Sequence, residues 1–235
     1  MIVFLVLLLV SVCAYSQHHE SAAEVLEKSI RYHDPANRWQ TFHQTLNLEE
    51  SRPNGTLRQV SVTLDILNEL FTYEMQDGEI HITRVLDRDS CSASLNGSVQ
   101  FSKEEEEKYR LSCDRIKWYR NYYLYLYGLP MKLKEPGTNL ADQVMNSKFL
   151  GKEVLSLKVT YDESVGNDIW YFYFDPTNYR LVGYRFYHDE SKNDGEYITL
   201  EDEYKIGEMR LPKIRKWYFN KDQKYLGTDT LRSHE

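Results

Sequence analysis

The spacing of apolar residues changes along the chain, and each spacing predicts a different kind of element. Over residues 20–32 the apolar side chains recur at helical intervals, with Glu and Lys on the opposite face, which predicts an amphipathic helix. This helix should end near His33 and Asp34, because Pro35 disfavours a helical backbone in the residue before it. From Thr41 onward the interval falls to two, as expected for strands with one face in water.

Alternating segments of this kind fill most of the remaining chain. Four of them lie between residues 41 and 86, separated by the turn signals Pro53-Asn54-Gly55 and Asp77-Gly78. Six more strands are expected at 152–161, 168–175, 180–188, 196–205, 209–219 and 224–231. The total is ten or so strands, and the turns between them are short enough for antiparallel pairing.

A helical pattern interrupts the strands between residues 102 and 126. Ser102 and Glu105 form a capping box at its start, and Gly128 marks its end. The apolar stripe of this segment is wide and rich in tyrosine, so it must be covered by the sheet or by something else. A short helix is expected at 139–145.

Together these elements predict an α+β fold. It consists of a large curved antiparallel sheet of roughly ten strands, an N-terminal helix and a central helical insertion. A sheet with that many strands should curl into a partial or complete barrel. We assign residues 17–235 to a single domain of this kind.

The start of the chain predicts export. Residues 2–13 form an apolar run that is shorter than the roughly 20 residues of a membrane span, and small residues follow at Ala14 and Ser16. We interpret residues 1–16 as a signal peptide, with a membrane anchor or a lipid on Cys13 as alternatives. The mature chain would then have no transmembrane span, and its destination would be the periplasm, the cell envelope or the exterior.

Two cysteines remain after the signal, Cys91 and Cys113. In a compartment that permits disulfides, an even pair predicts a bridge, and two buried free thiols are the alternative. Closing a loop of about 22 residues would stabilise the fold by roughly 3 kcal/mol in the chain-entropy model. No metal site is predicted, because neither cysteine has a ligand-like neighbour at metal-site spacing.

Composition excludes several classes of protein. The 36 Asp and Glu outnumber the 29 Lys and Arg, and the formal net charge of −7 argues against nucleic-acid binding. An aromatic content of 14% argues against disorder. No glycine-rich phosphate loop, nucleophile elbow or metalloprotease motif occurs, so no cofactor is predicted and a binding protein is favoured over an enzyme.

Two polar clusters remain as candidates for catalysis. His188, Asp189 and Glu190 precede Asp194 and Glu196, and carboxylates of this kind supply metal ligands or an acid and base pair. The same residues are typical of a solvated hairpin tip. The second candidate is the pair formed by residues 33 and 34, and the histidines at 18 and 19 are a weak candidate for metal chelation.

Two strands carry an unusual number of aromatic residues. Alternation places Trp170, Phe172 and Phe174 on one face of the first strand. The next strand offers Val182, Tyr184 and Phe186, so two aromatic rows should run side by side. Such rows form either a filled core or the wall of an apolar cavity that accepts a hydrophobic ligand.

Several motifs of the chain resemble a family of secreted Bacteroidota proteins with a domain of unknown function. The motifs are YHDP (32–35), YYLYLYGLPMKL (122–133), FDP (174–176), GYRFY (183–187), DGEYI (194–198) and LGTD (226–229). That family looks like a remote relative of the periplasmic lipoprotein carriers of the LolA and LolB type. The resemblance implies a curved antiparallel half-barrel, lidded by helices, around an apolar cavity for acyl chains.

The resemblance implies no ligand-binding residue, because no carrier residue matches one by one. A bridge between Cys91 and Cys113 departs from the carrier pattern, since a tethered helix would open less freely as a lid.

Three functions stay open at this point. The leading hypothesis is a cell-envelope protein that binds a lipid or another hydrophobic or amphiphilic small ligand in a half-barrel cavity, without catalysis. The alternatives are an envelope module with a filled core that meets an unidentified protein partner, and an envelope hydrolase. For the leading hypothesis we expect the cavity to be lined by Trp39, Tyr123, Trp170, Phe172, Phe174 and Phe186.

Overall fold

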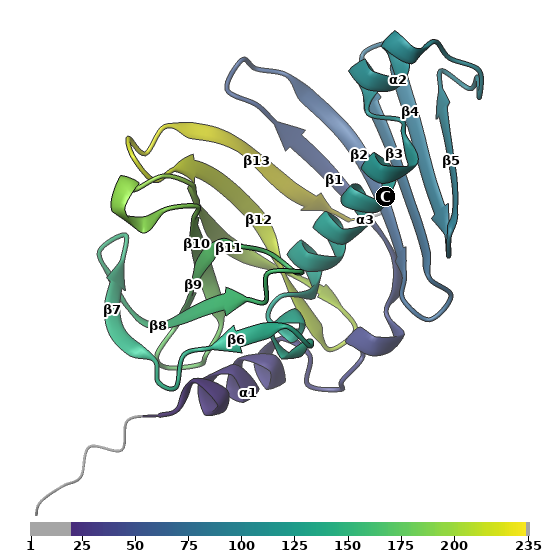
Figure 1. Ribbon diagram of the computed structural model, residues 1–235. Coiled ribbons are helices and arrows are strands. Elements are labelled where there is room, and N and C mark those ends of the chain that lie inside the picture. The colour runs from purple at the N-terminus through teal and green to yellow at the C-terminus, as the bar shows by residue number, and fades with distance from the viewer. Residues whose placement is uncertain (1–19, 234–235) are drawn as a thin grey trace, which may run out of the picture.

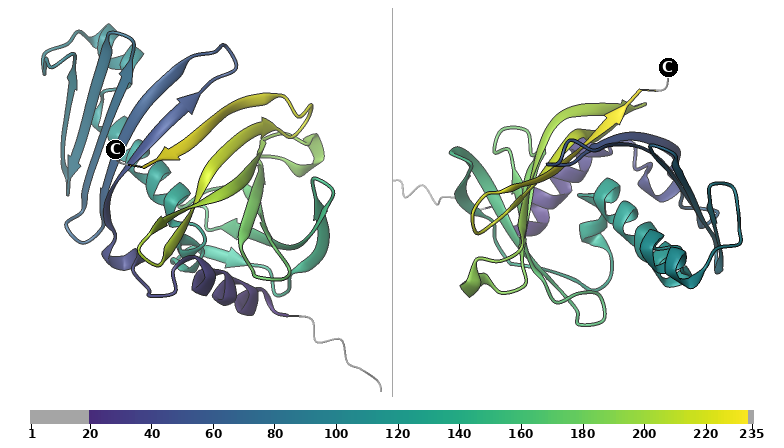
Figure 2. Two further views of the ribbon diagram at one scale, coloured as in Figure 1. Left: turned by 180° about the vertical axis from the view of Figure 1, so that it is seen from behind. Right: turned by 90° about the horizontal axis from the view of Figure 1, so that it is seen from above.

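One antiparallel sheet forms the frame of the protein, as the computed structural model of residues 20–233 shows (Figure 1). Its thirteen strands include twelve in the order β5-β4-β3-β2-β1-β13-β12-β11-β10-β9-β8-β6, while β7 pairs with β8 off this path. Every described pairing is antiparallel. The order is linear from β5 to β6, so the sheet is not closed. Figure 2 shows that the sheet is strongly curved. The predicted α+β class and the curved antiparallel sheet are confirmed.

The strands of the first half lie close to the predicted segments. They are β1 (His43–Ser51), β2 (Leu57–Asp65), β3 (Leu70–Asp77), β4 (Ile80–Asp87) and β5 (Ser90–Leu95). The second half contains β6 (Thr138–Leu140), β7 (Met145–Phe149), β8 (Lys152–Tyr161), β9 (Ile169–Phe174), β10 (Leu181–Tyr187), β11 (Glu196–Ile206), β12 (Met209–Phe219) and β13 (Tyr225–Arg232).

Three α-helices and three short 3-10 helices complete the fold. The α-helices are α1 (Ala22–His33), α2 (Lys103–Tyr109) and α3 (Cys113–Gly128). The 3-10 helices are η1 (Trp39–Thr41), η2 (Met131–Lys134) and η3 (Glu190–Lys192). Capping boxes open α1 at Ser21 and α2 at Ser102, so the predicted start of the central segment is correct.

The central helical segment is two helices, whereas the sequence pattern predicted one. Arg110 adopts a left-handed backbone with φ of 55° and ends α2. The buried Arg84 of β4 then donates hydrogen bonds to the carbonyls of Tyr109 at 2.6 Å and Arg110 at 3.1 Å. Because Arg84 of the sheet donates to these two carbonyls, they keep hydrogen-bond partners although α2 ends there.

The prediction of a short helix at 139–145 is wrong. The chain there forms β6, a short connection and β7, and both strands pair with β8. The backbone N–H of Ala141 also donates to the carbonyl of Lys158. Pairing with a long neighbouring strand outweighs the weak helical pattern of a short segment. With β5, these two strands raise the total above the ten expected.

A β-bulge in β10 changes the face of the sheet on which one predicted residue lies. Val182 was expected on the same face of β10 as Tyr184 and Phe186. The register shifts between Leu181 and Gly183, and Val182 packs instead near Phe149 on the opposite face of the sheet.

Helix α3 lies across the concave face of the curved sheet (Figure 2). One of its sides packs on the β1–β5 half, where Tyr123 lies 5.7 Å from the ring of Tyr73. A disulfide between Cys91 in β5 and Cys113 at the start of α3 ties the helix to the same half, with 5.5 Å between the two Cα atoms. The predicted bridge is present.

The other end of α3 is held by a buried arginine from β12. Pro130 has no N–H, so the carbonyl of Leu126 lacks the partner that a continuing helix would give it. Arg215, which is 2% exposed, donates to that carbonyl at 2.9 Å and lies 4.2 Å from the ring centre of Tyr127. A cation at a helix C-terminus also meets the negative end of the helix dipole.

His33 and Asp34 close α1 as structural residues. The buried ring of His33 donates from Nδ1 to the carbonyl of Arg210 at 2.7 Å and accepts at Nε2 from the N–H of Leu181 at 3.0 Å. These partners fix the neutral tautomer, and burial lowers the pKa of His33 to about 4. Asp34 accepts hydrogen bonds from two backbone N–H groups at the start of η1.

The state of His33 predicts a pH dependence of stability. Because the unfolded chain binds a proton near pH 6.5 and the folded chain does not until about pH 4, stability should fall between these values by up to roughly 3 kcal/mol. His33→Gln cannot titrate. In urea unfolding, we expect the stability difference between wild type and this variant to shrink as pH falls from about 7.5 to about 4.5.

His188→Gln is the matched control with the opposite sign. The hydrogen bond from His188 to Asp168 raises the pKa of His188, so the wild type should gain stability relative to this variant on acidification. A difference between wild type and His33→Gln that stays constant over the pH range would refute the assignment of a neutral His33.

Candidate functional site

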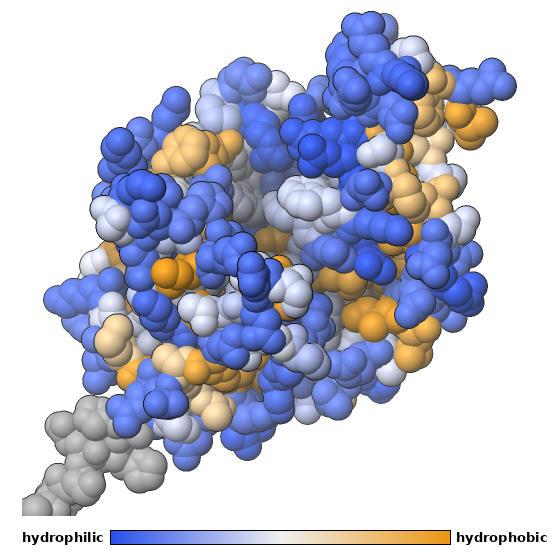
Figure 3. Space-filling model, viewed as in Figure 1, coloured by the Kyte–Doolittle hydropathy of each residue, from blue (hydrophilic) through white to orange (hydrophobic). Residues whose placement is uncertain are grey.

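A cleft of about 760 Å³ lies between α3 and the concave face of the second half of the sheet. The space-filling view shows the surface hollowed beside α3, in front of β12 and β13 (Figure 3). Side chains of α3 fill the space against the first half of the sheet, whereas against the second half Tyr125 contacts Trp170, with 5.4 Å between ring centroids, and space remains open beside this contact. The cleft is therefore a consequence of where α3 crosses the sheet.

The helical wall of the cleft is one face of α3. Trp118, Asn121, Tyr122, Tyr125 and Leu126 line it, at the intervals of three and four that align side chains on a helix. The ring of Trp118 stacks on that of Tyr122 with 5.2 Å between centroids, and Trp118 is 47% exposed at the rim. Most of this wall is aromatic, which matches the wide tyrosine-rich stripe of the sequence.

The sheet wall is built from cross-strand rows of side chains. Trp170 of β9 pairs with Phe186 of β10, and Phe186 pairs with Glu196 of β11. The rings of Trp170 and Phe186 are stacked with 4.8 Å between centroids. The neighbouring row contributes Tyr184, Ile198 and Trp217.

The six residues expected to line a cavity divide into two groups. Trp170 and Phe186 are half-buried and line the cleft. Phe172 and Phe174 follow Trp170 on the same face of β9, but both are fully buried in the core beyond the cleft. Their burial by the neighbouring elements separates them from the lining.

Tyr123 and Trp39 also lie in the core rather than in the lining. Tyr123 points to the first half of the sheet, and its hydroxyl donates to the carboxylate of Glu50 at 3.2 Å. Trp39 packs on Phe42 and against Gly128, where any larger side chain would collide with the indole ring. Trp39 therefore helps to seat the end of α3.

One end of the cleft has a buried group of charges. Arg52 donates to Glu50 at 2.7 Å and to Asp229 at 3.4 Å, and each carboxylate is 5% exposed. Burial and the neighbouring Glu50 raise the pKa of Asp229 to about 7, against the opposing effects of Arg52 and Arg215. Arg52 and Asp229 line the cleft, so this network forms a polar floor there.

The other end has carboxylates of a different kind. Asp168 accepts a hydrogen bond from Nδ1 of His188 at 2.6 Å, beside the aromatic row. Glu196 is half-buried, and burial raises its pKa although His188 opposes this effect. Both carboxylates line the cleft.

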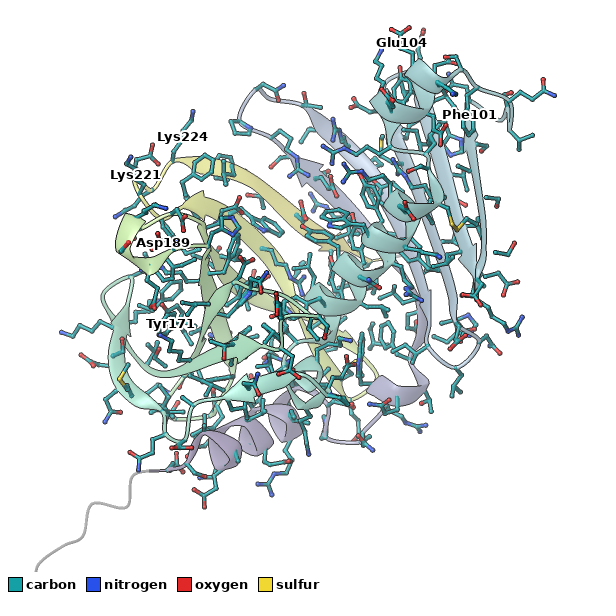
Figure 4. The ribbon with its side chains drawn as sticks, in the orientation of Figure 1. Phe101, Glu104, Tyr171, Asp189, Lys221 and Lys224 are labelled. Carbon is teal, nitrogen blue, oxygen red and sulfur yellow. A yellow bond between two sulfur atoms is a disulfide. The ribbon has the colours of Figure 1, made fainter. Side chains whose placement is uncertain are left out.

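The other members of the acidic cluster stabilise a loop. Asp194 accepts hydrogen bonds from the backbone N–H groups of His188 and Asp189, both at 2.9 Å. Asp189 in turn accepts from the N–H of Ser191 at 3.0 Å. Figure 4 shows Asp189 in the outer loop between β10 and β11, near the β12–β13 hairpin. Across residues 20–233, no three His, Cys, Asp or Glu side chains come together in a way that would hold a metal ion.

Several residues of the site were not singled out from the sequence. Trp217 and Asp229 lie on β12 and β13, and Asp229 belongs to the LGTD motif, but the motif gave neither residue a role in a site; Arg52 follows β1 in a turn. The helical spacing of Trp118, Tyr122 and Tyr125 was visible, but the sequence does not show which side of the helix the sheet covers.

The fold and the cleft define an open antiparallel half-barrel with a helix across its concave face. The chain belongs to DUF6503, a family of unknown function whose model matches residues 1–233. No curated protein matches it. The histidines at 18 and 19 and the segment expected to be a signal peptide lie outside the described residues.

Solved structures resemble the chain in fold. A LolA superfamily protein from Nitrosomonas europaea is 13% identical with a TM-score of 0.49, over 91% of this chain and 92% of that chain. A DUF1329 family protein from Desulfovibrio piger is 7% identical with a TM-score of 0.51, over 89% of this chain and 90% of that chain. At these identities the likeness concerns the fold alone. None of the helices within residues 20–233 has the length and apolar character needed to span a membrane.

The polar floor predicts a cost for removing its arginine. Arg52→Met would leave Glu50 and Asp229 without their shared cation, so we expect urea unfolding at about pH 8 to show a loss of roughly 3 kcal/mol. The loss should be smaller at about pH 5.5, because Asp229 is then protonated and has no charge to leave uncompensated.

The matched control is Arg58→Met. Arg58 bonds to Asp77 at 2.8 Å on a partly exposed surface of the same half of the sheet, so its loss should cost less than about 1 kcal/mol at either pH. Equal losses for the two variants would contradict a buried network at Arg52.

Proposed function

We propose that the protein binds a hydrophobic or amphiphilic small ligand in the cleft between α3 and strands β9–β13. The observation that carries this proposal is the cleft itself, with about 760 Å³ of space between two aromatic walls. Ligand sites in proteins commonly have volumes of about 300–1,000 Å³, mostly apolar walls and a few polar groups.

The composition of the walls suits a ligand with a long apolar part. Trp170, Phe186, Tyr125 and Trp217 present rings from both sides. The hydroxyls of Tyr125 and Tyr161 share a hydrogen bond of 2.7 Å. These two rings can therefore meet an apolar chain without leaving their hydroxyls unpaired.

Burial of apolar ligand surface in the cleft would supply a large part of the binding free energy. Burying about 300 Å² of apolar ligand surface contributes roughly 7 kcal/mol at about 25 cal/mol per Å². The costs of association reduce this figure, so a micromolar ligand would need additional polar contacts. Polar groups at both ends of the cleft are placed to supply them.

The proposal includes a location in the cell envelope. It is supported by the sequence of residues 1–16, which has the pattern of a signal peptide, and by a disulfide that suits an oxidising compartment.

The alternative of a protein-interaction module has one observation in its favour. The half of the concave face beneath α3 is filled by side chains such as Phe71 and Tyr73 and accepts no ligand. The cleft in the other half supports the binding proposal, since a module with a filled core would have none.

A substitution that fills the cleft should abolish binding. Asn121 is exposed on α3 and lines the cleft, so Asn121→Trp adds bulk there without disturbing the core. We expect the purified wild type to enhance the fluorescence of N-phenyl-1-naphthylamine with saturable, stoichiometric binding. The variant should bind this probe at least about tenfold more weakly, because the apolar contact area is lost.

Lys117→Trp is the control, because Lys117 is exposed on the same helix but does not line the cleft. It should bind the probe as the wild type does. Absence of saturable binding by the wild type, or equal binding by both variants, would reject the cleft as a ligand site and favour the interaction module.

A further inference from the structure

Acidic side chains outnumber basic ones in the lining of the cleft. Three carboxylates line it, from Asp168, Glu196 and Asp229, against a single guanidinium from Arg52. Arg52 already bonds to Asp229 and to Glu50. Its positive charge is therefore compensated within the protein and is not free to receive an anionic head group.

Glu196 occupies an unusual position in the aromatic row. It pairs in register with Phe186 on one side and with Phe219 on the other, and Trp170 lies beyond Phe186. Strand partners place their side chains on the same face, so a carboxylate stands between aromatic rings. Within residues 20–233, no hydrogen bond or ion pair holds the carboxylate of Glu196, and the effect of His188 only partly opposes the rise in its pKa caused by burial.

We propose that the cleft selects an amphiphile with a positively charged head, such as an alkylammonium, whose head lies against Glu196 and the rings of Trp170 and Phe186. This inference rests on the proposed function, since it concerns the ligand of the same cleft.

Two attractions favour a cation at this place. The carboxylate attracts it by charge, and the effect is strengthened where neighbouring side chains exclude water. Ring faces attract it through their quadrupole, and organic ammonium groups with apolar substituents suit aromatic walls. An anionic head would meet both the carboxylate and the negative ring faces.

A second carboxylate extends the same environment. Asp168 lies two residues before Trp170, immediately ahead of β9, and also lines the cleft. Its bond from His188 uses Oδ1. The rings of Trp170 and Phe186 are thus flanked by acidic groups on two sides.

The electrostatics of the free protein agree with this assignment. Burial raises the pKa of Glu196, which shows that the ionised carboxylate is under-compensated by its surroundings. A bound cation would supply the missing compensation. Asp229 differs, because Arg52 and Arg215 already act on it.

The test compares three probes that share one alkyl chain. Decyltrimethylammonium, decanol and decanoate differ in the charge of the head, and each is titrated by calorimetry at about pH 7.5, the two ionic probes below their critical micelle concentrations and decanol below its solubility limit. We expect decyltrimethylammonium to bind about tenfold more tightly than decanoate, with decanol between them. Glu196→Gln should reduce this preference by about fivefold and leave the affinity for decanol unchanged.

The control for net charge is Glu201→Gln. Glu201 lies on the same strand as Glu196, is exposed, and pairs with Lys216 outside the cleft. Both variants change the net charge of this acidic protein equally, so a preference that falls in both would be a general surface effect and would overturn the proposal. Retention of the preference in Glu201→Gln and its loss in Glu196→Gln would support it.

The outcomes also separate this inference from the proposed function. If none of the three probes binds, the cleft does not bind amphiphiles and the proposed function fails. If all three bind with similar affinity, or decanoate binds most tightly, the proposed function stands and the selection for a cation is rejected.

Discussion

The hydrogen bond from Arg215 to the carbonyl of Leu126 is the interaction on which the rest of the structure depends. It supplies the partner that Pro130 cannot provide and seats the C-terminal end of α3 on β12. The guanidinium is buried, so the interaction is poorly screened and the helix end has a defined position. Without it, a helix with an aromatic side facing the cleft would have no fixed distance from the sheet.

That position decides where the concave face is filled and where it is open. The sheet bends around α3, but a single helix covers only the strip of sheet that it crosses. Tyr123 and Tyr73 close the space on the side of β3, while Trp118 and Tyr122 line the cleft on the opposite side. The cleft follows from the curvature of a long sheet and the width of one helix, and needs no special backbone geometry of its own.

The elements that local chemistry determines could be predicted from the sequence. The capping boxes at Ser21 and Ser102 and the alternation of β1–β4 depend on neighbours within a few residues. The short strands β6 and β7 could not be predicted, because their formation depends on pairing with β8. The end of α2 at Arg110 likewise depends on Arg84, which lies far away in the sequence.

The site shows the same division. Alternation correctly placed Trp170 and Phe172 on one face of β9, yet only the first lines the cleft. A two-residue period states which face a side chain occupies and not how deeply it lies along that face. Depth is set by α3, whose own position depends on Arg215 and on the disulfide. The charged groups around Arg52 come from β1 and β13, strands that are distant in sequence, so their encounter could be known only from the topology.

These anchors also determine how a ligand would enter. Cys91 holds the start of α3, and Arg215 and Trp39 hold its end, so the helix is a fixed wall and not a lid. The exposed apolar side chains at the rim are Trp118 on α3 and Val165 in the connection between β8 and β9. In the proposed complex the head of the amphiphile would lie beside the half-buried Glu196, whose carboxylate offsets the cost of removing water from the head.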